Sequence, residues 1–276
     1  MDNLVSTSWL SDHLYTDDLL ILDASWHLPT AKRDARAEYE SGHIPGAQFF
    51  DIDAISDKGT TLPHMLPTAE KFSAEVGKLG VSNNKKIICY DSVGLFSAAR
   101  CWWMFKVFGH DNVAVLDGGL KKWLAENRAV EAGSTAAEFQ NFAAVYRPAM
   151  VKSADEVAAE HGQIADARSP TRFRGEEAEP RPGVKPGHIP SAKNVHYSSL
   201  LNADGTMKSA PQLARAFAEA GIDMASPVTT SCGSGVTAAI LSLALSVLGA
   251  KSHALYDGSW AEWGASAREI ETGPAR

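Results

Sequence analysis

The chain has 276 residues, of which 45% are hydrophobic and 21% are charged, and its formal net charge at pH 7 is −7. This length allows two domains with buried cores, and the composition is typical of a soluble globular protein. The acidic balance and the lack of a Lys/Arg cluster disfavour nucleic acids and anionic membranes as partners, since both attract clustered basic side chains.

The N-terminus resembles no targeting peptide, because residues 1–14 contain neither a basic stretch nor an apolar one. The longest apolar stretch, residues 238–250, is too short to span a bilayer. We therefore expect a cytoplasmic protein with no membrane partner.

The first half of the chain alternates apolar strand-like stretches with helical ones. Residues 19–25 begin this series, and Thr68 is placed to cap a helix. Residues 85–91 form a β-like stretch that contains Cys89, and residues 97–108 have a helical pattern that contains Cys101. Three widely spaced cysteines fit neither a disulfide framework nor a metal site, so we expect Cys89 and Cys101 to be reduced core thiols.

The second half of the chain repeats this alternation. Its predicted helices begin after Ser153 and Ser209, each in a capping-box pattern, and an apolar helix ends near Gly249. Short strands are predicted at 163–166, 227–231 and 252–256, and a last helix begins within 257–263. The small and polar residues before position 150 indicate a linker, so we predict domains at 1–135 and 151–276 joined by residues 136–150.

Three motifs occur twice in the same order. Residues 42–47 (Gly-His-Ile-Pro-Gly-Ala) return at 187–192, the stretch 19–25 resembles 163–169, and 117–123 resembles 257–263, with offsets between 140 and 145 residues. Three offsets of similar length indicate a tandem duplication of a unit of about 130 residues. Alternating strands and helices predict an α/β fold, in which each unit has a mainly parallel sheet flanked by helices.

The third cysteine, Cys232, lies between a predicted strand and a predicted helix, in the loop Ser231-Cys-Gly-Ser-Gly-Val-Thr237. Ligands bind at this carboxyl edge of open α/β sheets, and a helix N-terminus favours an anion. Gly233 and Gly235 allow several backbone N–H groups to converge on one point. The loop should therefore stabilise the thiolate form of Cys232, which is the nucleophilic form.

The first repeat supports a chemical role for this cysteine. When the repeats are aligned, Asp91 falls opposite Cys232. A carboxylate cannot perform thiol chemistry, so one copy has the nucleophile and the other lacks it. A cysteine chosen only for its size would leave this difference unexplained.

The duplicated unit, the paired Gly-His-Ile-Pro motifs and the loop Cys-Gly-Ser-Gly-Val-Thr resemble the two-domain rhodanese superfamily over nearly the whole chain. This resemblance implies two rhodanese-like domains, of which the first is inactive. It also implies a sulfurtransferase in which Cys232 takes sulfur from 3-mercaptopyruvate as a persulfide and releases pyruvate. A thiol, a thioredoxin-like protein or cyanide would then accept the sulfur, and no metal or organic cofactor is implied.

The resemblance also implies roles for individual residues. Arg172 and Arg181 would hold the substrate carboxylate and keto oxygen, and planar guanidinium groups suit a carboxylate. Asp53, His64 and Ser234 would form a proton relay, which the spacing of these residues does not predict by itself. The remaining substrate-binding residues are implied to be those of the loop, namely Gly233, Gly235, Val236 and Thr237.

Three alternatives remain at this stage. A thiosulfate sulfurtransferase shares the chemistry but uses a dianionic donor, and relatives that use thiosulfate have Arg and Lys where this loop has Gly233 and Ser234. A cysteine-dependent phosphatase needs Arg six residues after the nucleophile, where this chain has Ala238. A non-catalytic persulfide carrier would have a reactive Cys232 but no multiple turnover.

Overall fold

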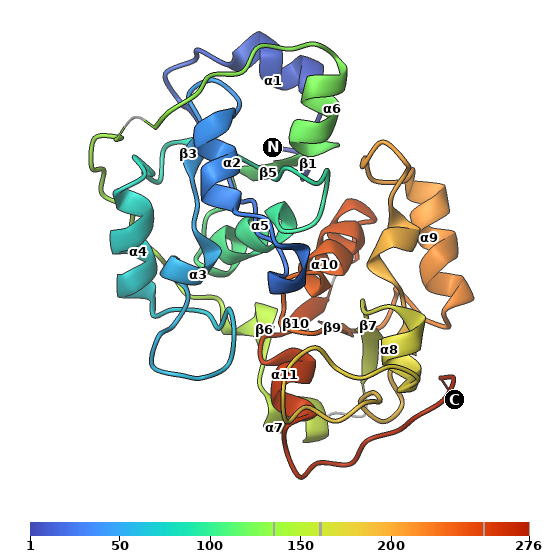
Figure 1. Cartoon of the computed structure of the whole chain (residues 1–276). Coiled ribbons are helices and arrows are strands. Elements are labelled where there is room, and N and C mark those ends of the chain that lie inside the picture. Colours follow the sequence, from blue (N-terminus) through green and yellow to red (C-terminus); the bar gives the residue numbers. More distant parts are fainter. Residues whose placement is uncertain (135, 160–161, 251, 276) are drawn as a thin grey trace. The chain divides into compact units, whose positions relative to one another are not determined.

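The computed structural model describes residues 1–134, 136–159, 162–250 and 252–275, so the predicted boundary at residue 135 lies outside the described residues (Figure 1). The chain divides into two compact units. The first unit consists of residues 1–57, 67–147 and 202–207, and the second consists of residues 58–66, 148–201 and 208–276. Each unit therefore contains one short segment from the other half of the sequence: residues 202–207 belong to the first unit, and residues 58–66 belong to the second.

The first unit is built around a five-stranded sheet with the strand order β1-β5-β4-β2-β3, in which every pairing is parallel. The strands are β1 (Leu4–Val5), β2 (Leu19–Asp23), β3 (Gln48–Phe49), β4 (Lys86–Tyr90) and β5 (Val113–Leu116). The helices are α1 (Thr7–His13), η1 (Pro29–Ala31), α2 (Ala35–Ser41), α3 (Ile52–Ile55), α4 (Ala69–Gly77), α5 (Ala98–Val107) and α6 (Gly119–Ala125).

The second unit repeats this topology with the strand order β6-β10-β9-β7-β8, again all parallel. The strands are β6 (Val151–Lys152), β7 (Gln163–Asp166), β8 (Lys193–Asn194), β9 (Val228–Ser231) and β10 (His253–Tyr256). The helices are η2 (Pro148–Met150), α7 (Ala154–Ala159), α8 (Pro170–Arg174), η3 (Tyr197–Leu200), α9 (Ala210–Glu219), α10 (Ala238–Val247) and α11 (Ser259–Trp263). The identical strand order confirms the predicted fold class and duplication.

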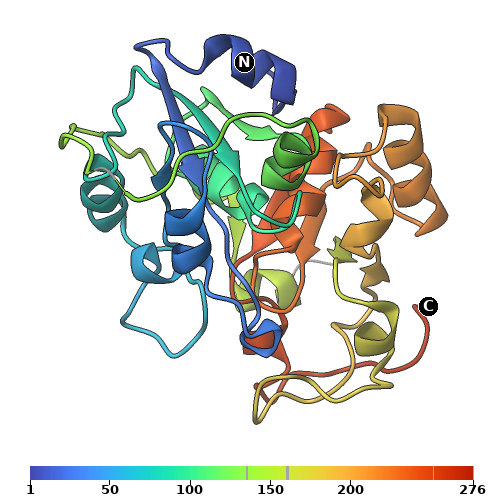
Figure 2. The same cartoon turned by 45° about the horizontal axis from the view of Figure 1, so that its top comes forward.

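Both sheets carry helices on both faces, as Figures 1 and 2 show for each unit. In the second unit, one face packs against α7, α8 and α11 through Val157, Phe173 and Trp260, and α10 packs against β9 and β10. The residues of α10 from Ala238 to Leu245 are buried, as in a helix that is covered nearly all round. Burial on both sides explains why the strands β4 and β5 of the first unit are nearly continuous apolar stretches.

The predicted helix starts are confirmed. Ser209 forms a capping box with Gln212, and the Ser153 and Glu156 side chains exchange bonds with each other's backbone N–H. Thr68 accepts a hydrogen bond from the Lys71 amide. These side chains satisfy amides that have no partner within their own helix.

The predicted linker lies against the first unit up to Arg147. Phe142 is buried there in an aromatic cluster with Phe72 and Phe105. The Arg147 guanidinium forms two bonds of 2.8 Å with the Asp111 carboxylate and lowers the pKa of Asp111 to about 2. This segment has no regular structure before η2, yet its aromatic side chain extends the core.

Four edge strands, β1, β3, β6 and β8, were not among the predicted elements. Each has two residues, which is too short for the period-two pattern that identifies a strand in a sequence. Within the described ranges, no helix is both long enough and apolar enough to cross a membrane.

Candidate active site

Cys232 lies where the sequence places it, directly after β9 and before α10 in the second unit. It is 2% exposed, and its Sγ accepts a hydrogen bond of 3.1 Å from the Gly235 amide. Gly235 has φ +78°, a left-handed conformation that turns its amide back toward the sulfur. The Ala239 and Ile240 amides of α10 bond the Val236 and Thr237 carbonyls, and the loop before them directs the Gly235 N–H to the sulfur.

The equivalent loop of the first unit shows what these amides can hold. The Asp91 carboxylate follows β4 and accepts bonds of 2.7–3.0 Å from five backbone amides, those of Val93, Gly94, Phe96, Ser97 and Ala98. Asp91 is completely buried. In the first unit the anion cradle is therefore filled by a side chain of its own loop, whereas in the second unit the same position carries a thiol.

His64 belongs to the second unit and contacts the loop. Its Nδ1 lies 3.1 Å from Ser234 Oγ and 3.4 Å from the Ser234 carbonyl oxygen, and the imidazole is buried. The His64 backbone has φ +61°, which is uncommon for a residue with a β-carbon. A strained backbone that places an imidazole on a hydroxyl beside a thiol is typical of a functional site.

Asp53 lies in α3 of the first unit and is exposed. Its Oδ2 accepts a bond of 2.9 Å from Trp26 Nε1. The two relay residues that the second unit itself brings together are thus His64 and Ser234, and the participation of Asp53 stays a prediction.

Arg172 projects from α8 toward the loop. A β-carbon added to Gly233 would lie 3.2 Å from Arg172 Nη2, so the absent side chain at position 233 leaves room for the guanidinium. Glu179 Oε2 accepts a bond of 2.5 Å from the same nitrogen, and Glu179 is 3% exposed at its side chain. Arg172 is therefore held beside the loop by a buried carboxylate.

Glu179 is shared with a second arginine, Arg168, which sequence reasoning missed. The Arg168 guanidinium is buried, bonds Asp166, Glu179 and the Gly187 carbonyl, and stacks over Trp260. Although burial opposes its charged form, Asp166 and Glu179 hold the pKa of Arg168 above its ordinary value. Two carboxylates and two guanidinium groups thus form one balanced network that orients Arg172. The repeat could have signalled this, since Ser25 stands in the first copy where Arg168 stands in the second.

The other two arginines of this segment differ in exposure and partner. Arg174 pairs with Glu176 through bonds of 2.6 and 2.8 Å at the surface. Arg181 is half-buried in the loop after Glu179, and its role in binding substrate stays a prediction.

The remaining loop residues line the same turn. Val236 is buried and Gly233 is partly exposed. Thr237 occupies the N-cap position of α10 and makes no capping bond with its side chain. Its φ of −76° and ψ of −18° are already helical, unlike the extended backbone that is usual at an N-cap. Its role in binding substrate stays a prediction.

Cys89 and Cys101 are fully buried in the first unit, with their sulfur atoms 3.2 Å apart. Burial and the neighbouring thiol raise the pKa of Cys101 well above its ordinary value. Both are therefore buried core thiols, as predicted, and Cys232 is the thiol that lies in the glycine-rich loop.

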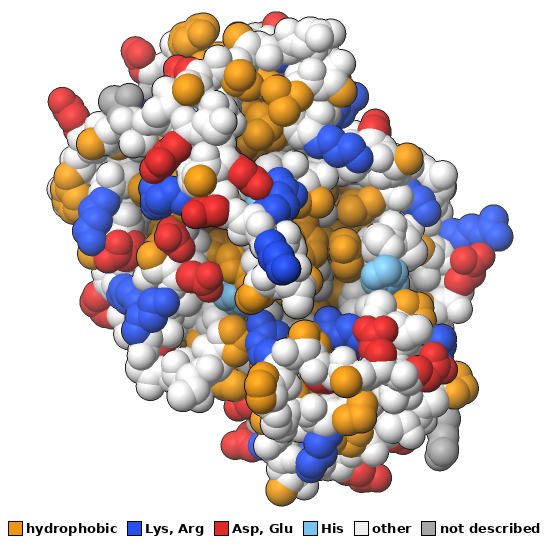
Figure 3. Space-filling view, in the orientation of Figure 1, with side chains coloured by type: hydrophobic (Ala, Val, Ile, Leu, Met, Phe, Trp, Pro, Cys, Tyr) orange, Lys and Arg blue, Asp and Glu red, His pale blue; other side chains and the backbone are white. Residues whose placement is uncertain are grey.

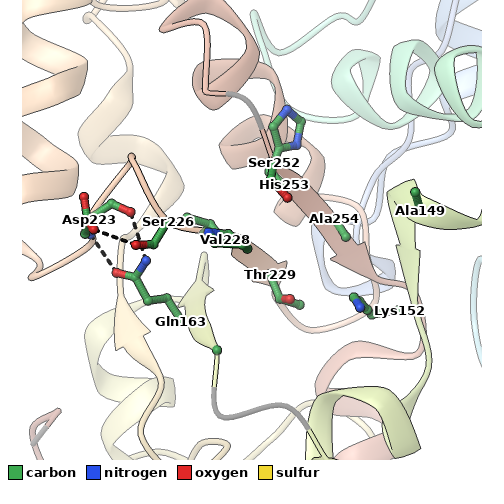
Figure 4. A pocket seen from close by; sticks show the side chains of 12 residues that line it. Ala149, Lys152, Gln163, Asp223, Ser226, Val228, Thr229, Ser252, His253 and Ala254 are labelled. Atoms are coloured by element: carbon green, nitrogen blue, oxygen red, sulfur yellow. Dashed lines mark hydrogen bonds between the residues drawn. The ribbon is translucent and has the colours of Figure 1, made fainter.

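A cavity of about 760 Å³ opens on another part of the second unit (Figure 4). It is lined by residues at the amino ends of β7, β9 and β10, away from the edge that carries Cys232. Its polar side chains Gln163, Asp223 and Ser226 bond one another or nearby backbone, as Figure 4 shows.

On the face drawn in Figure 3, acidic and basic side chains are interspersed. Among the described residues, no cluster of three or more His, Cys, Asp or Glu side chains could hold a metal ion.

A duplicated parallel sheet with a thiol that accepts a backbone amide bond at one carboxyl edge defines a class of cysteine-dependent α/β proteins, and comparisons with known proteins agree. The rhodanese-like domain model matches residues 6–126 and 151–266. The chain is 42% identical over 275 residues to a human protein named 3-mercaptopyruvate sulfurtransferase, covering 96% of this chain and 93% of that one. It is 43% identical over 268 residues to the protein of the same name from Escherichia coli K12, covering 95% of each.

A solved structure resembles the whole chain as well. The crystal structure of SseA from Escherichia coli, described as a 3-mercaptopyruvate sulfotransferase with the rhodanese fold, matches with a TM-score of 0.86 and 39% identity over 94% of this chain and 99% of that one. The chain belongs to the rhodanese family and contains two rhodanese-like domains.

Proposed function

We propose that this chain is a sulfurtransferase that takes sulfur from 3-mercaptopyruvate and passes it on from a persulfide of Cys232. The observation that carries the proposal is the Cys232 sulfur in an amide cradle, with the Ser234 hydroxyl and the His64 imidazole beside it. The human and Escherichia coli relatives bear the name of this activity. Release of pyruvate over many turnovers, in the presence of a thiol acceptor, tests the proposal.

The first half-reaction transfers one sulfur atom. The Cys232 thiolate attacks the sulfur of 3-mercaptopyruvate, an S–S bond forms, and the C–S bond of the donor breaks. The electron pair of that bond remains with the leaving enolate of pyruvate, which then takes up a proton. Backbone amides of the loop, as for Asp91 in the first unit, can hold the persulfide anion that remains.

The proton for the enolate is proposed to come from Ser234. Its hydroxyl lies 3.1 Å from His64 Nδ1, within the range in which an imidazole and a hydroxyl exchange a proton. We extend the relay to Asp53, whose carboxylate would fix the His64 tautomer as in a hydrolase triad. The serine acts here as a proton donor and the cysteine as the nucleophile.

The substrate carboxylate is proposed to bind Arg172 and Arg181. Arg172 already lies beside Gly233 and is held by Glu179, so little side-chain entropy is lost when the substrate binds. Arg181 belongs to the same segment and would complete a bidentate pair.

We expect Arg181→Gly to raise KM for 3-mercaptopyruvate by at least about tenfold, because a charged hydrogen bond contributes about 1.5–3 kcal/mol. Steady-state kinetics with 3-mercaptopyruvate and with thiosulfate give the measurement. Arg174→Gly is the matched control, since Arg174 pairs with Glu176 at the surface, and its KM should stay unchanged. Equal effects of Arg181→Gly on both donors would remove Arg181 from carboxylate binding.

Thiosulfate is the competing donor. It is a dianion without a carbon skeleton, and the loop offers it no charged side chain at positions 233 and 234. A donor with one remote carboxylate and a singly charged sulfur fits this loop better.

Ser234→Lys is therefore expected to raise the ratio of kcat/KM for thiosulfate to that for 3-mercaptopyruvate by about 10²-fold. The lysine adds a cation near the sulfur and removes the proposed proton donor, and each change is worth on the order of tenfold or more. Kinetics of the two donors with the same acceptor give the ratio. A ratio that stays at the wild-type value contradicts this account of donor choice.

The acceptor of the second half-reaction is proposed to be a thiol, either a small molecule or a reduced thioredoxin-like protein, with cyanide as a substitute in vitro. The three cysteines are free thiols, as a reducing compartment such as the cytoplasm would keep them. A persulfide carrier without catalysis would load Cys232 once and release no further pyruvate.

A further inference from the structure

A buried aspartate directly after β10 holds the segment that carries His64. Asp257 is 4% exposed, and its Oδ2 accepts a bond of 2.7 Å from the Leu66 amide. Leu66 ends the segment 58–66, which belongs to the second unit. The bond lies two residues after His64, at the point where this segment leaves the unit.

The bond between Asp257 and the Leu66 amide matters because the backbone conformation of His64 needs support from surrounding contacts. Its left-handed backbone, φ +61°, is unfavourable for a residue with a β-carbon and persists only where surrounding contacts impose it. The imidazole contacts Ser234 from this conformation. A small relaxation of the segment would therefore change the distance between Nδ1 and the hydroxyl.

The first unit contains an equivalent hydrogen bond between an aspartate and a backbone amide, but no histidine in the segment that it holds. Asp117 directly follows β5, and its Oδ1 accepts a bond of 2.7 Å from the Met207 amide, at the end of the segment 202–207 of that unit. Two residues before Met207 stands Gly205, with φ +87°. A β-carbon added to Gly94, in the loop that holds Asp91, would lie 3.0 Å from the Gly205 Cα.

The two units thus share the aspartate, the amide bond and the left-handed turn against the loop, and they differ in the residue at that turn. Glycine adopts φ > 0 without strain, and it stands in the unit without a nucleophile. Histidine stands in the unit with Cys232. The residue with the strained backbone, His64, thus stands in the unit that has the reactive cysteine. A turn with a purely structural role does not explain this difference between the units.

We propose that Asp257 is a positioning residue for sulfur transfer, whose bond to the Leu66 amide sets the His64 imidazole against Ser234. The inference rests on the proposed function, in which His64 and Ser234 deliver the proton to the enolate. Asp257 acts through the backbone of the segment and does not touch the substrate.

The test compares Asp257→Ala with Asp117→Ala, the matched control in the first unit. Asp257→Ala should lower the single-turnover rate of Cys232 persulfide formation from 3-mercaptopyruvate by about 10²-fold, the cost of misplacing a catalytic group by about 1 Å. Asp257→Asn keeps an acceptor oxygen and should restore most of this rate. Asp117→Ala should leave the rate near the wild-type value. Equal losses in the two alanine variants would overturn the proposal.

A double-mutant cycle with His64→Gly separates positioning from general destabilisation. If Asp257 acts through His64, Asp257→Ala should lower the rate no further in the His64→Gly background. A further loss of about 10²-fold in that background would show that Asp257 acts by another route.

Two further measurements complete the design. Should Asp257→Ala not fold, Leu66→Pro removes the donor N–H from the other side of the bond, with Met207→Pro as its control in the first unit; equal rates in these two variants would contradict the proposal. Alkylation of Cys232 by iodoacetamide should be unchanged in Asp257→Ala, because the thiol itself is not disturbed. If the wild-type protein releases no pyruvate from 3-mercaptopyruvate, the proposed function fails, whereas its release with equal rates in all variants refutes only the role of Asp257.

Discussion

Replacement of Cys232 by serine is expected to abolish sulfur transfer from 3-mercaptopyruvate, with kcat/KM lowered by at least about 10⁴-fold. The hydroxyl of serine cannot form a persulfide, so the first half-reaction has no product to pass on. Intact-protein mass spectrometry after treatment with 3-mercaptopyruvate should show one added sulfur atom in the wild type and none in the variant. Addition of a thiol should then remove the added sulfur from the wild type.

Cys101→Ala is the control for this experiment. Cys101 is buried in the core of the first unit beside Cys89, and burial raises its pKa, so it offers no thiolate to the donor. The variant should still gain one sulfur atom and release pyruvate at nearly the wild-type rate. If Cys101→Ala lost the added sulfur and Cys232→Ser retained it, the persulfide would be on Cys101, and the proposed role of Cys232 would be contradicted.

Asp91→Ala is expected to destabilise the first unit by at least about 4 kcal/mol. The carboxylate is fully buried and accepts bonds from five amides. Its removal leaves these donors without an acceptor, and buried polar groups that lose a charged partner carry the largest mutational costs. Hydrogen exchange of the amides of residues 92–98 should become faster by about three orders of magnitude, since each 1.4 kcal/mol is a factor of ten.

The matched control is Asp34→Ala in the same unit. Asp34 caps α2 at the surface and accepts bonds from two amides, so its loss should cost about 1 kcal/mol. Urea denaturation of the two variants gives the comparison. A similar small loss in both would mean that water or neighbouring side chains replace the Asp91 carboxylate.

Asp91→Ala and Cys232→Ser probe the equivalent loops of the two units. In the first unit the amides between strand and helix bond the Asp91 carboxylate, and we therefore expect this copy to bind no substrate anion. In the second unit the side chain of Cys232 is shorter, and its sulfur accepts a hydrogen bond from the Gly235 amide. We propose that other amides of this loop donate hydrogen bonds to the persulfide anion as it forms. Duplication therefore produced one structural copy and one chemical copy from a single cradle.

The short-range features of this protein follow from its sequence. Strands such as Gln163–Asp166 and helices such as Ala210–Glu219 were predicted within one or two residues, because apolar patterning and side-chain caps act over a single turn or strand. The repeat offsets revealed the duplication, and the exchange of Asp91 for Cys232 predicted which residue is the nucleophile.

Tertiary structure decided how distant side chains support that nucleophile. His64 and Ser234 are 170 residues apart, and Asp257 lies 191 residues from Leu66, so no local pattern in the chain joins them. Glu179 stands in an acidic loop segment with Glu176 and Glu177, yet its side chain is buried, because it pairs with both Arg168 and Arg172. The sequence by itself predicted the reactive loop, and its resemblance to a known family named His64 and Arg172. Only the tertiary structure showed that His64 contacts Ser234 and that the buried carboxylates of Asp166 and Glu179 hold the guanidinium groups beside the loop, because those contacts depend on how parallel strands bring remote loops to one edge of a sheet.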